Sequence, residues 1–205
     1  MDIKKKTQTN AGAATGSRGE QRREQILKAL HDCIISKGYS KTTLKDVANA
    51  ADMTASHLLY YFPGKDAILE YYFENVANLL LARIEEFSDE PAERQINLLA
   101  DLFFAGKGLT RSEIGFMLEC FGVAVHDTKL RHMKMRLDRK CKAYLTGLFE
   151  SLSGSKGAGA QDAAELAYAI LIGLRTAAYF DRKLELPEAR RLFREAIIRL
   201  ARRPR

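Results

Sequence analysis

The chain has 205 residues, of which 46% are hydrophobic and 29% are charged, so it can form one large globular domain or two small ones. Its formal net charge of +7 favours polyanionic partners. Three widely spaced cysteines without a CxxC pair indicate neither a zinc site nor a disulfide framework. The N-terminus lacks the apolar segment of a signal peptide, and the apolar stretch AELAYAILIGL is too short to span a membrane. We therefore expect a cytoplasmic protein with no membrane partner.

The first segment, residues 1–17, contains almost no bulky apolar side chain, which predicts a disordered basic tail. Its lysines, Lys4–Lys6, could hold DNA as an arm or remain solvated. The spacing of Ile26, Leu30 and Ile34 then predicts a helix over 19–37 that ends at Gly38.

Two short helices follow. Thr43 and Asp46 have the spacing of a capping box, which predicts a helix ending at residue 50 or 51. Thr54 can cap a second helix through residue 60 or 61, and Pro63-Gly64 ends it. Asp52 occupies the turn between them, where a left-handed backbone is expected.

Apolar periodicity and breaker residues predict longer helices in the rest of the chain, over 65–86, 91–105, 110–126, 128–152, 161–181 and 187–203. No run alternates apolar and polar residues long enough to suggest a strand. The fold is therefore expected to be all-α, with a helix-turn-helix domain over 18–64 and a larger helical domain over 65–205.

The two short helices have the pattern of a helix-turn-helix unit. Small and apolar residues of the first, Val47, Ala48 and Ala51, can pack on Leu58 and Phe62 of the second. The second helix would then present its outer side to a DNA major groove, through Ala55, Ser56, Leu59 and Tyr60.

The stretch TTLKDVANAADMTASHLLYYFPGKDAIL resembles the DNA-binding signature of the tetracycline-repressor (TetR) family of bacterial transcriptional regulators. The resemblance runs from Glu20 to about Leu69 and includes the Gly38-Tyr39 turn and the aromatic-Phe-Pro-x-Lys ending. It implies a three-helix DNA-binding domain followed by a helical domain for ligand binding and dimerisation. The implied function is a sequence-specific regulator, a repressor released from a palindromic operator of double-stranded DNA by a small-molecule effector.

The resemblance also implies roles for individual residues. Phosphate contacts fall to Thr43, His57, Tyr61 and Lys65. Base contacts fall to Lys45, Ala55, Ser56, Leu59 and Tyr60. The chain departs from the family at His57, where a threonine is frequent, and at Leu59, where a tyrosine is frequent. Two alternatives remain open: Thr43 also has a capping role, and the Tyr60-Tyr61 pair could belong to the core.

An effector pocket in the second domain is implied by the family, and its candidate residues are Phe103, Met117, Phe121, Tyr144, Tyr168 and Arg175. Arg175 and Glu119 each lie in a strongly apolar helical stretch. A buried arginine needs a carboxylate side chain or an anionic ligand as partner. A structural ion pair or a solvent-facing position is favoured over a ligand contact for both residues.

A homodimer is implied through the last two long helices. The helix over 161–181 carries many small side chains that permit close helix approach: Ala163, Ala164, Ala167, Ala169, Gly173, Ala177 and Ala178. Apolar area would come from Leu166, Ile170 and Leu174. The alternative is that the small residues pack inside one chain. The arginines of the last segment, Arg190–Arg205, are interpreted as a solvated helix face rather than a second nucleic-acid contact.

Competing functions are a helical enzyme and a helical adaptor for another protein. No activated nucleophile, paired acid–base set or phosphate-binding glycine loop is present, so we expect no catalytic residue and no cofactor. His126, Asp127 and His132 could bind a metal, but nothing places them on one face, and no metal site is expected.

Overall fold

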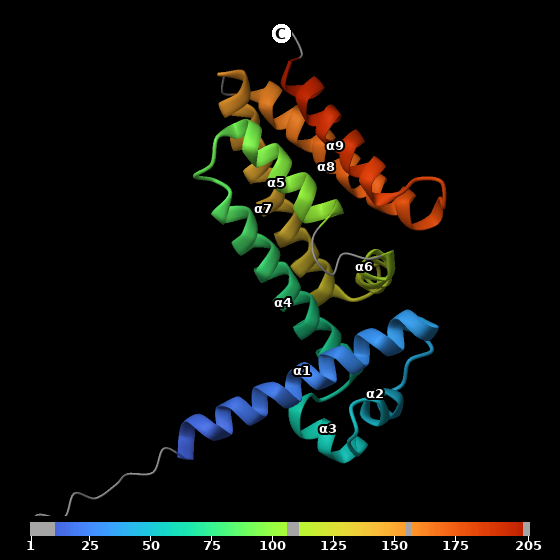
Figure 1. The fold of residues 1–205 in the computed structure, drawn as a ribbon. Coiled ribbons are helices and arrows are strands. Elements are labelled where there is room, and N and C mark those ends of the chain that lie inside the picture. Colours follow the sequence, from blue (N-terminus) through green and yellow to red (C-terminus); the bar gives the residue numbers. More distant parts are fainter. Residues whose placement is uncertain (1–10, 106–110, 155–156, 203–205) are drawn as a thin grey trace, which may run out of the picture. The chain divides into compact units, whose positions relative to one another are not determined.

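The computed structural model describes residues 11–105, 111–154 and 157–202 (Figure 1). Every regular element in these ranges is an α-helix, which confirms the all-α prediction. The chain divides into two compact units, the first ending at Leu69 and the second beginning at Glu70.

The first unit contains α1 (Ala11–Lys37), α2 (Leu44–Ala50), α3 (Ala55–Tyr61) and the start of α4 (Lys65–Glu86). Helix α2 packs against both α1 and α3. The buried side chains are those expected from the apolar spacing, and they include Ile26, Leu30, Ile34, Val47, Ala48, Ala51, Leu58 and Phe62. These side chains form a small core, and the inner side of α3 packs against it.

The boundaries of the short helices follow from local chemistry. Gly38 has φ 79°, so it ends α1 in the left-handed conformation that glycine tolerates. Asp52 has φ 53° in the turn between α2 and α3, as predicted. The Thr43 side chain caps α2 in a complete capping box with Asp46, and the Thr54 side chain accepts a hydrogen bond from the backbone N–H of His57.

Two boundaries of the first unit differ from the predictions. Helix α1 begins at Ala11, so the tail predicted over 1–17 is helical from that residue on, and its first ten residues lie outside the described ranges. The first unit also extends past the predicted limit at residue 64, because the first turn of α4 is bonded to the turn after α1.

The second unit contains the rest of α4 with α5 (Ala92–Phe104), α6 (Arg111–Ala124), α7 (Thr128–Ser153), α8 (Ala158–Phe180) and α9 (Leu186–Ala201). Helix α8 packs on α6, α7 and α9, and α5 packs on α7 and α9. Large side chains fill the space between them, among them Leu99, Phe104, Phe116, Phe149, Leu171 and Phe193. The predicted helices all occur, with ends shifted by a few residues.

Helix α8 is longer than the sequence indicated. It has 23 residues. Among the described helices it is the one long and apolar enough to cross a membrane, judged by length and composition alone. The apolar stretch AELAYAILIGL, which alone is too short to span a membrane, is therefore only part of this helix. Only 22% of its most apolar window is buried inside the chain, although the helix packs on three neighbours. Part of its apolar surface is left uncovered.

Candidate nucleic-acid interface and effector cavity

The outer side of α3 is exposed, although its inner side belongs to the core. Tyr60 is 83% exposed and Leu59 is 48% exposed, whereas Leu58 and Phe62 are 0% and 3% exposed. The interpretation of both tyrosines as core residues is therefore wrong, because Tyr60 lies in solvent. Of the other predicted DNA contacts, Thr43, Lys45, Ser56 and His57 are exposed, and Ala55, Tyr61 and Lys65 are half-buried.

The Tyr61 ring lies against two other rings at the end of α3. Its centroid lies 5.3 Å from that of Tyr60 in an edge-on arrangement and 5.5 Å from that of His57. Aromatic pairs at such separations are stabilising. The three predicted contact residues thus form one aromatic group.

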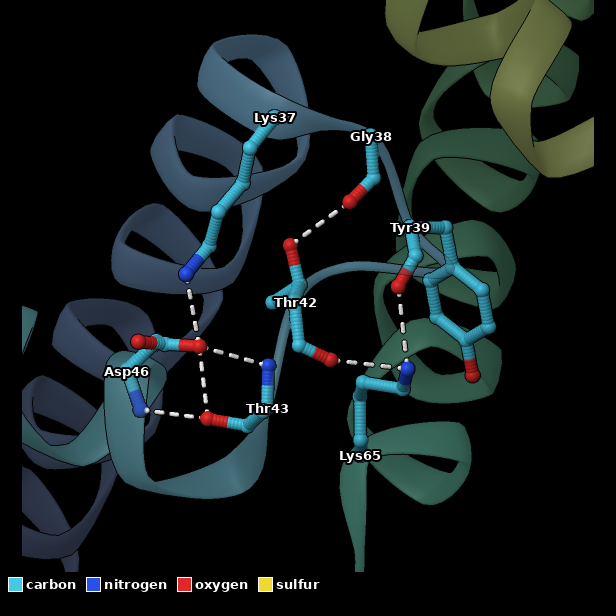
Figure 2. Close-up of polar contacts among 7 residues, drawn as sticks. All are labelled: Lys37, Gly38, Tyr39, Thr42, Thr43, Asp46 and Lys65. Atoms are coloured by element: carbon cyan, nitrogen blue, oxygen red, sulfur yellow. Dashed lines mark hydrogen bonds and ion pairs between the residues drawn. The ribbon is translucent and has the colours of Figure 1, made fainter.

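Lys65 is tied to the turn between α1 and α2, as Figure 2 shows. Its ammonium donates hydrogen bonds to the backbone carbonyls of Tyr39, at 2.9 Å, and Thr42, at 2.8 Å, and it lies 4.0 Å from the centroid of the Tyr39 ring. The Thr42 hydroxyl donates to the Gly38 carbonyl at 2.8 Å, and the Tyr39 hydroxyl donates to Asp66. An ammonium has three N–H groups, so within the described ranges these two hydrogen bonds leave one donor of Lys65 for a further partner. Sequence reasoning missed these contacts because they join residues far apart in the chain.

Thr43 performs the capping role that competes with phosphate binding (Figure 2). Its hydroxyl accepts from the backbone N–H of Asp46 at 3.2 Å and donates to Asp46 Oδ2 at 2.6 Å. Lys37 lies 2.7 Å from the same carboxylate oxygen. Hydrogen bonds from Lys37 and then Thr43 hold the pKa of Asp46 well below its ordinary value. The Thr43 hydroxyl proton is therefore already engaged within the cap.

The second unit contains a largely apolar cavity formed by residues of α4, α5, α6, α7 and α8. It is lined by Leu80, Phe103, Ile114, Met117, Leu118, Phe121, Leu137, Cys141, Tyr168, Leu171, Ile172, Arg175 and Thr176. Five of the six predicted pocket residues are among these, and Tyr144 is not. The aliphatic members were not singled out from sequence because an apolar residue facing a cavity has the same periodicity as one in the core.

Tyr144 lies instead in a polar contact between α7 and α5. Its hydroxyl donates to Gln95 Oε1 at 2.5 Å, and burial raises its pKa to about 12. Gln95, only 8% exposed, donates from Nε2 to the Glu90 carbonyl at 2.7 Å. The phenol therefore satisfies a buried amide at the start of α5 rather than lining the cavity.

Arg175 is the charged residue of the cavity lining. Its guanidinium lies 5.8 Å from the centroid of the Phe103 ring and, within the described part of the chain, makes no hydrogen bond or ion pair. Burial lowers the pKa of this arginine, while Tyr168 and Glu113 oppose the shift electrostatically. The favoured interpretations, a structural ion pair or a solvent-facing position, are therefore not met for Arg175. For Glu119 the solvent-facing position is met, because this residue is exposed on α6.

The remaining candidates have local structural roles. Asp127 Oδ1 accepts a hydrogen bond of 2.7 Å from the backbone N–H of Leu130 and so caps α7. Across the ranges the structure describes, no group of three potential ligands could hold a metal ion. Arginines near the C-terminus form ion pairs on the surface, namely Arg190 with Asp101, Arg191 with Glu188 and Glu195, and Arg199 with Glu195.

Two family models match the chain. Residues 26–72 match the model of bacterial regulatory proteins of the tetR family, and residues 91–202 match the C-terminal model of BetI-type transcriptional repressors. The chain belongs to the TetR family. Members of the TetR family are DNA-binding transcriptional regulators and not enzymes.

Individual TetR-family relatives are distant. The chain is 26% identical over 157 residues to the regulator BetI 2 of Chromohalobacter salexigens, covering 75% of each chain. It is 24% identical to the probable regulator YttP of Bacillus subtilis over 36% of this chain, and spans only 38% of that relative's length. A transcriptional regulator from Saccharomonospora viridis, solved in complex with choline, has a TM-score of 0.76 at 20% identity, over 87% of this chain and 96% of that one. The last comparison shows a shared fold.

Proposed function

We propose that this TetR-family protein is a repressor that binds a palindromic operator as a homodimer and is released by a small-molecule effector. The observation that carries the DNA-binding half is the exposure of Leu59 and Tyr60 on a short helix whose other side is buried. A leucine and a tyrosine in solvent on a recognition-type helix are suited to the floor of a major groove, where apolar and hydrogen-bonding groups of bases are presented.

The contacts divide by chemistry. Tyr61, His57 and the remaining donor of Lys65 are suited to phosphates, which set the position of the protein on DNA. Thr43 stays a phosphate candidate of this proposal, although its hydroxyl and its backbone N–H both already donate to Asp46. Base reading falls to Lys45 with Ala55, Ser56, Leu59 and Tyr60, where the lysine reaches guanine acceptors and the apolar side chains lie on thymine methyl groups.

A second copy of the chain would cover the open side of α8 and α9. Leu166 is 43% exposed and Phe180 is 72% exposed on α8, and an open groove is lined by Ile170, Leu192, Glu195, Ala196, Arg199 and Leu200. Four of the alanines expected at a dimer contact, Ala163, Ala164, Ala167 and Ala178, are already buried within one chain. Accessible residues such as Ala169 and Gly173 remain for the partner. Two copies place two recognition helices on two half-sites.

The effector site of this proposal is the cavity of the second unit. Leu80 of α4 lines it, and α4 runs without interruption from Lys65, whose ammonium holds the α1–α2 turn. A ligand that favours a different arrangement of α4 would therefore change the position of the DNA-binding unit and lower its affinity for the operator. Similarity to the choline complex makes a quaternary ammonium ion one candidate.

Selection of bound sequences from a random DNA pool with the full-length chain tests the proposal. A symmetric site is expected, with two half-sites about one helical turn apart and with binding that weakens steeply as salt rises. An asymmetric consensus would contradict the dimer. Recovery of no consensus at all, with equal affinity for scrambled DNA, would contradict sequence-specific regulation.

A further inference from the structure

We propose that the cavity of the second unit binds a small organic carboxylate, with its apolar body among the ring and aliphatic side chains and its anionic group on Arg175. This inference rests on the proposed function of the cavity as an effector site, and it specifies the class of the effector. It differs from the quaternary ammonium ion that the choline complex makes a candidate.

The charge of the lining has one sign. Among the lining residues that the structure describes there is one arginine and no aspartate or glutamate, while the others are apolar or, as for Tyr168 and Thr176, neutral polar. A cationic ligand would therefore meet a cation and no carboxylate on the cavity wall. Transfer of any ion into such a site is costly unless an opposite charge compensates for lost hydration.

The Arg175 guanidinium can supply this opposite charge, because its hydrogen-bond donors are unused within the described residues. A guanidinium offers five N–H donors in a planar fork that matches a carboxylate. In the described residues none of these donors is used in a hydrogen bond or ion pair, and the group instead faces the Phe103 ring at 5.8 Å. Glu113 on α6 attracts Arg175 electrostatically without forming an ion pair with it. An incoming carboxylate would thus supply the hydrogen-bonding partner that the fold does not.

The aromatic rings of the cavity are already occupied by cations of the protein itself. Lys134 Nζ lies 4.5 Å from the centroid of Phe121 and 5.9 Å from that of Tyr168, and Lys142 Nζ lies 5.7 Å from the Tyr168 centroid. The Arg175 guanidinium lies over the Phe103 ring in the same way. Quaternary ammonium ions are recognised by free aromatic faces. Here such a ligand would have to compete with three built-in basic groups.

A nearby carboxylate, Asp138, is also engaged. Its two oxygens lie 2.7 and 2.6 Å from Lys134 Nζ, and the Tyr168 hydroxyl donates to Asp138 Oδ1 at 2.5 Å. Lys134 therefore neutralises Asp138, and Arg175 is, among the described lining residues, the charged group without an ion-pair partner. The carboxylate of a ligand would supply the ion-pair partner of Arg175.

The size of the cavity links binding to movement. Its open space is about 50 Å³, whereas an engineered cavity that admits benzene measures about 150 Å³. A ring-sized ligand must therefore move lining side chains or helices apart. Binding that requires an expanded cavity favours the expanded state, as an effector must do.

Three ligands of nearly the same shape and different charge provide the test: benzoate, benzamide and benzamidinium. Their binding to the full-length chain is measured by calorimetry, with choline as a fourth ligand. We expect benzoate to bind at least about tenfold more tightly than any of the other three. Arg175→Gln should remove that preference, whereas Arg139→Gln, which changes an exposed arginine on α7, should leave it intact. Hexanoate, hexanamide and hexylammonium repeat the series for an aliphatic body.

Each result decides the matter. If neither series favours the anion, or if choline or benzamidinium binds as tightly as benzoate, the inference is overturned. It is equally overturned if folded Arg175→Gln retains the preference for the carboxylate. The effect of each ligand on operator binding is measured separately by gel shift. Arg175-dependent binding of benzoate that leaves operator affinity unchanged would uphold the carboxylate site and contradict only release by an effector.

Discussion

Lys65 and Thr42 are joined by a hydrogen bond of 2.8 Å, in which the ammonium of the first residue of α4 donates to the carbonyl just before the cap of α2. The same ammonium binds the Tyr39 carbonyl. The lysine thereby fixes the turn from which α2 begins, and it positions the helix-turn-helix whether or not it also contacts DNA.

Lys65→Met should lower the free energy of unfolding by about 1–3 kcal/mol, because hydrogen bonds from a charged donor are lost while the apolar stem is retained. Urea unfolding measures this change, and Lys41→Met, at an exposed lysine of the same turn, is the control expected to have little effect. If Lys65 served only as a phosphate contact, the substitution would weaken DNA binding and leave the unfolding curve unchanged.

Tyr61→Phe should weaken binding to every DNA sequence by a similar factor. The substitution removes a hydroxyl assigned to a phosphate and keeps the ring that packs on Tyr60 and His57. A loss of about 1–2 kcal/mol is expected on cognate and scrambled duplexes alike. A selective loss on the cognate site would reassign Tyr61 to base reading.

Lys45→Ala should have the opposite signature. A lysine that reaches guanine acceptors contributes about 1–3 kcal/mol at one base step, so its loss should relax the preference there. Competition gel shifts against single-base variants of the selected site measure that preference. Equal losses on cognate and scrambled DNA would show that Lys45 contacts only the backbone.

Asp46→Asn should destabilise the protein in a pH-dependent way. The pKa of Asp46 is held below its unfolded value by Lys37 and Thr43, so the stabilisation is fully present above about pH 4 and is lost as the pH falls through the folded pKa. The difference in unfolding free energy between the native chain and the variant should therefore be largest near neutral pH and shrink in acid. A constant difference across this range would mean that the charge of Asp46 has no part in the cap.

Gly115→Ala should destabilise the contact between α6 and α8, since an added methyl group would lie 2.6 Å from the Tyr179 ring. Overpacking of this kind costs about 1–3 kcal/mol. Gly122→Ala on the same helix meets nothing within 4 Å and should instead stabilise the helix by about 0.5–1 kcal/mol. Thermal unfolding of the two variants should thus shift in opposite directions, and a second change, Tyr179→Leu, should rescue the first.

Local signals predicted the helix-turn-helix well because its boundaries depend on neighbouring residues. The Thr43–Asp46 box, the Thr54 cap and the left-handed Gly38 and Asp52 all depend on residues within a few positions. The expected packing of α2 on α3 predicted which side of α3 is exposed, and the TetR-family resemblance added the expected role of each residue on that side.

Long-range contacts were not predictable in the same way. Lys65 binds carbonyls more than twenty positions away, and Tyr144 binds Gln95 on another helix. The family resemblance had assigned Lys65 to phosphates and Tyr144 to the pocket. Whether Arg175 has a partner likewise depends on which helices surround it, and among the described residues it has no hydrogen bond or ion pair, which the sequence could not reveal.

The uninterrupted course of α4 also has a consequence for natural variation in chain length. Lys65 and Leu80 both belong to α4, and in a continuous α-helix each added residue turns the part that follows by about 100° and advances it by about 1.5 Å. One inserted or deleted residue would therefore change the face of α4 that carries Leu80 relative to the face that carries Lys65. Length changes should be tolerated in the loops between helices and rejected in this segment.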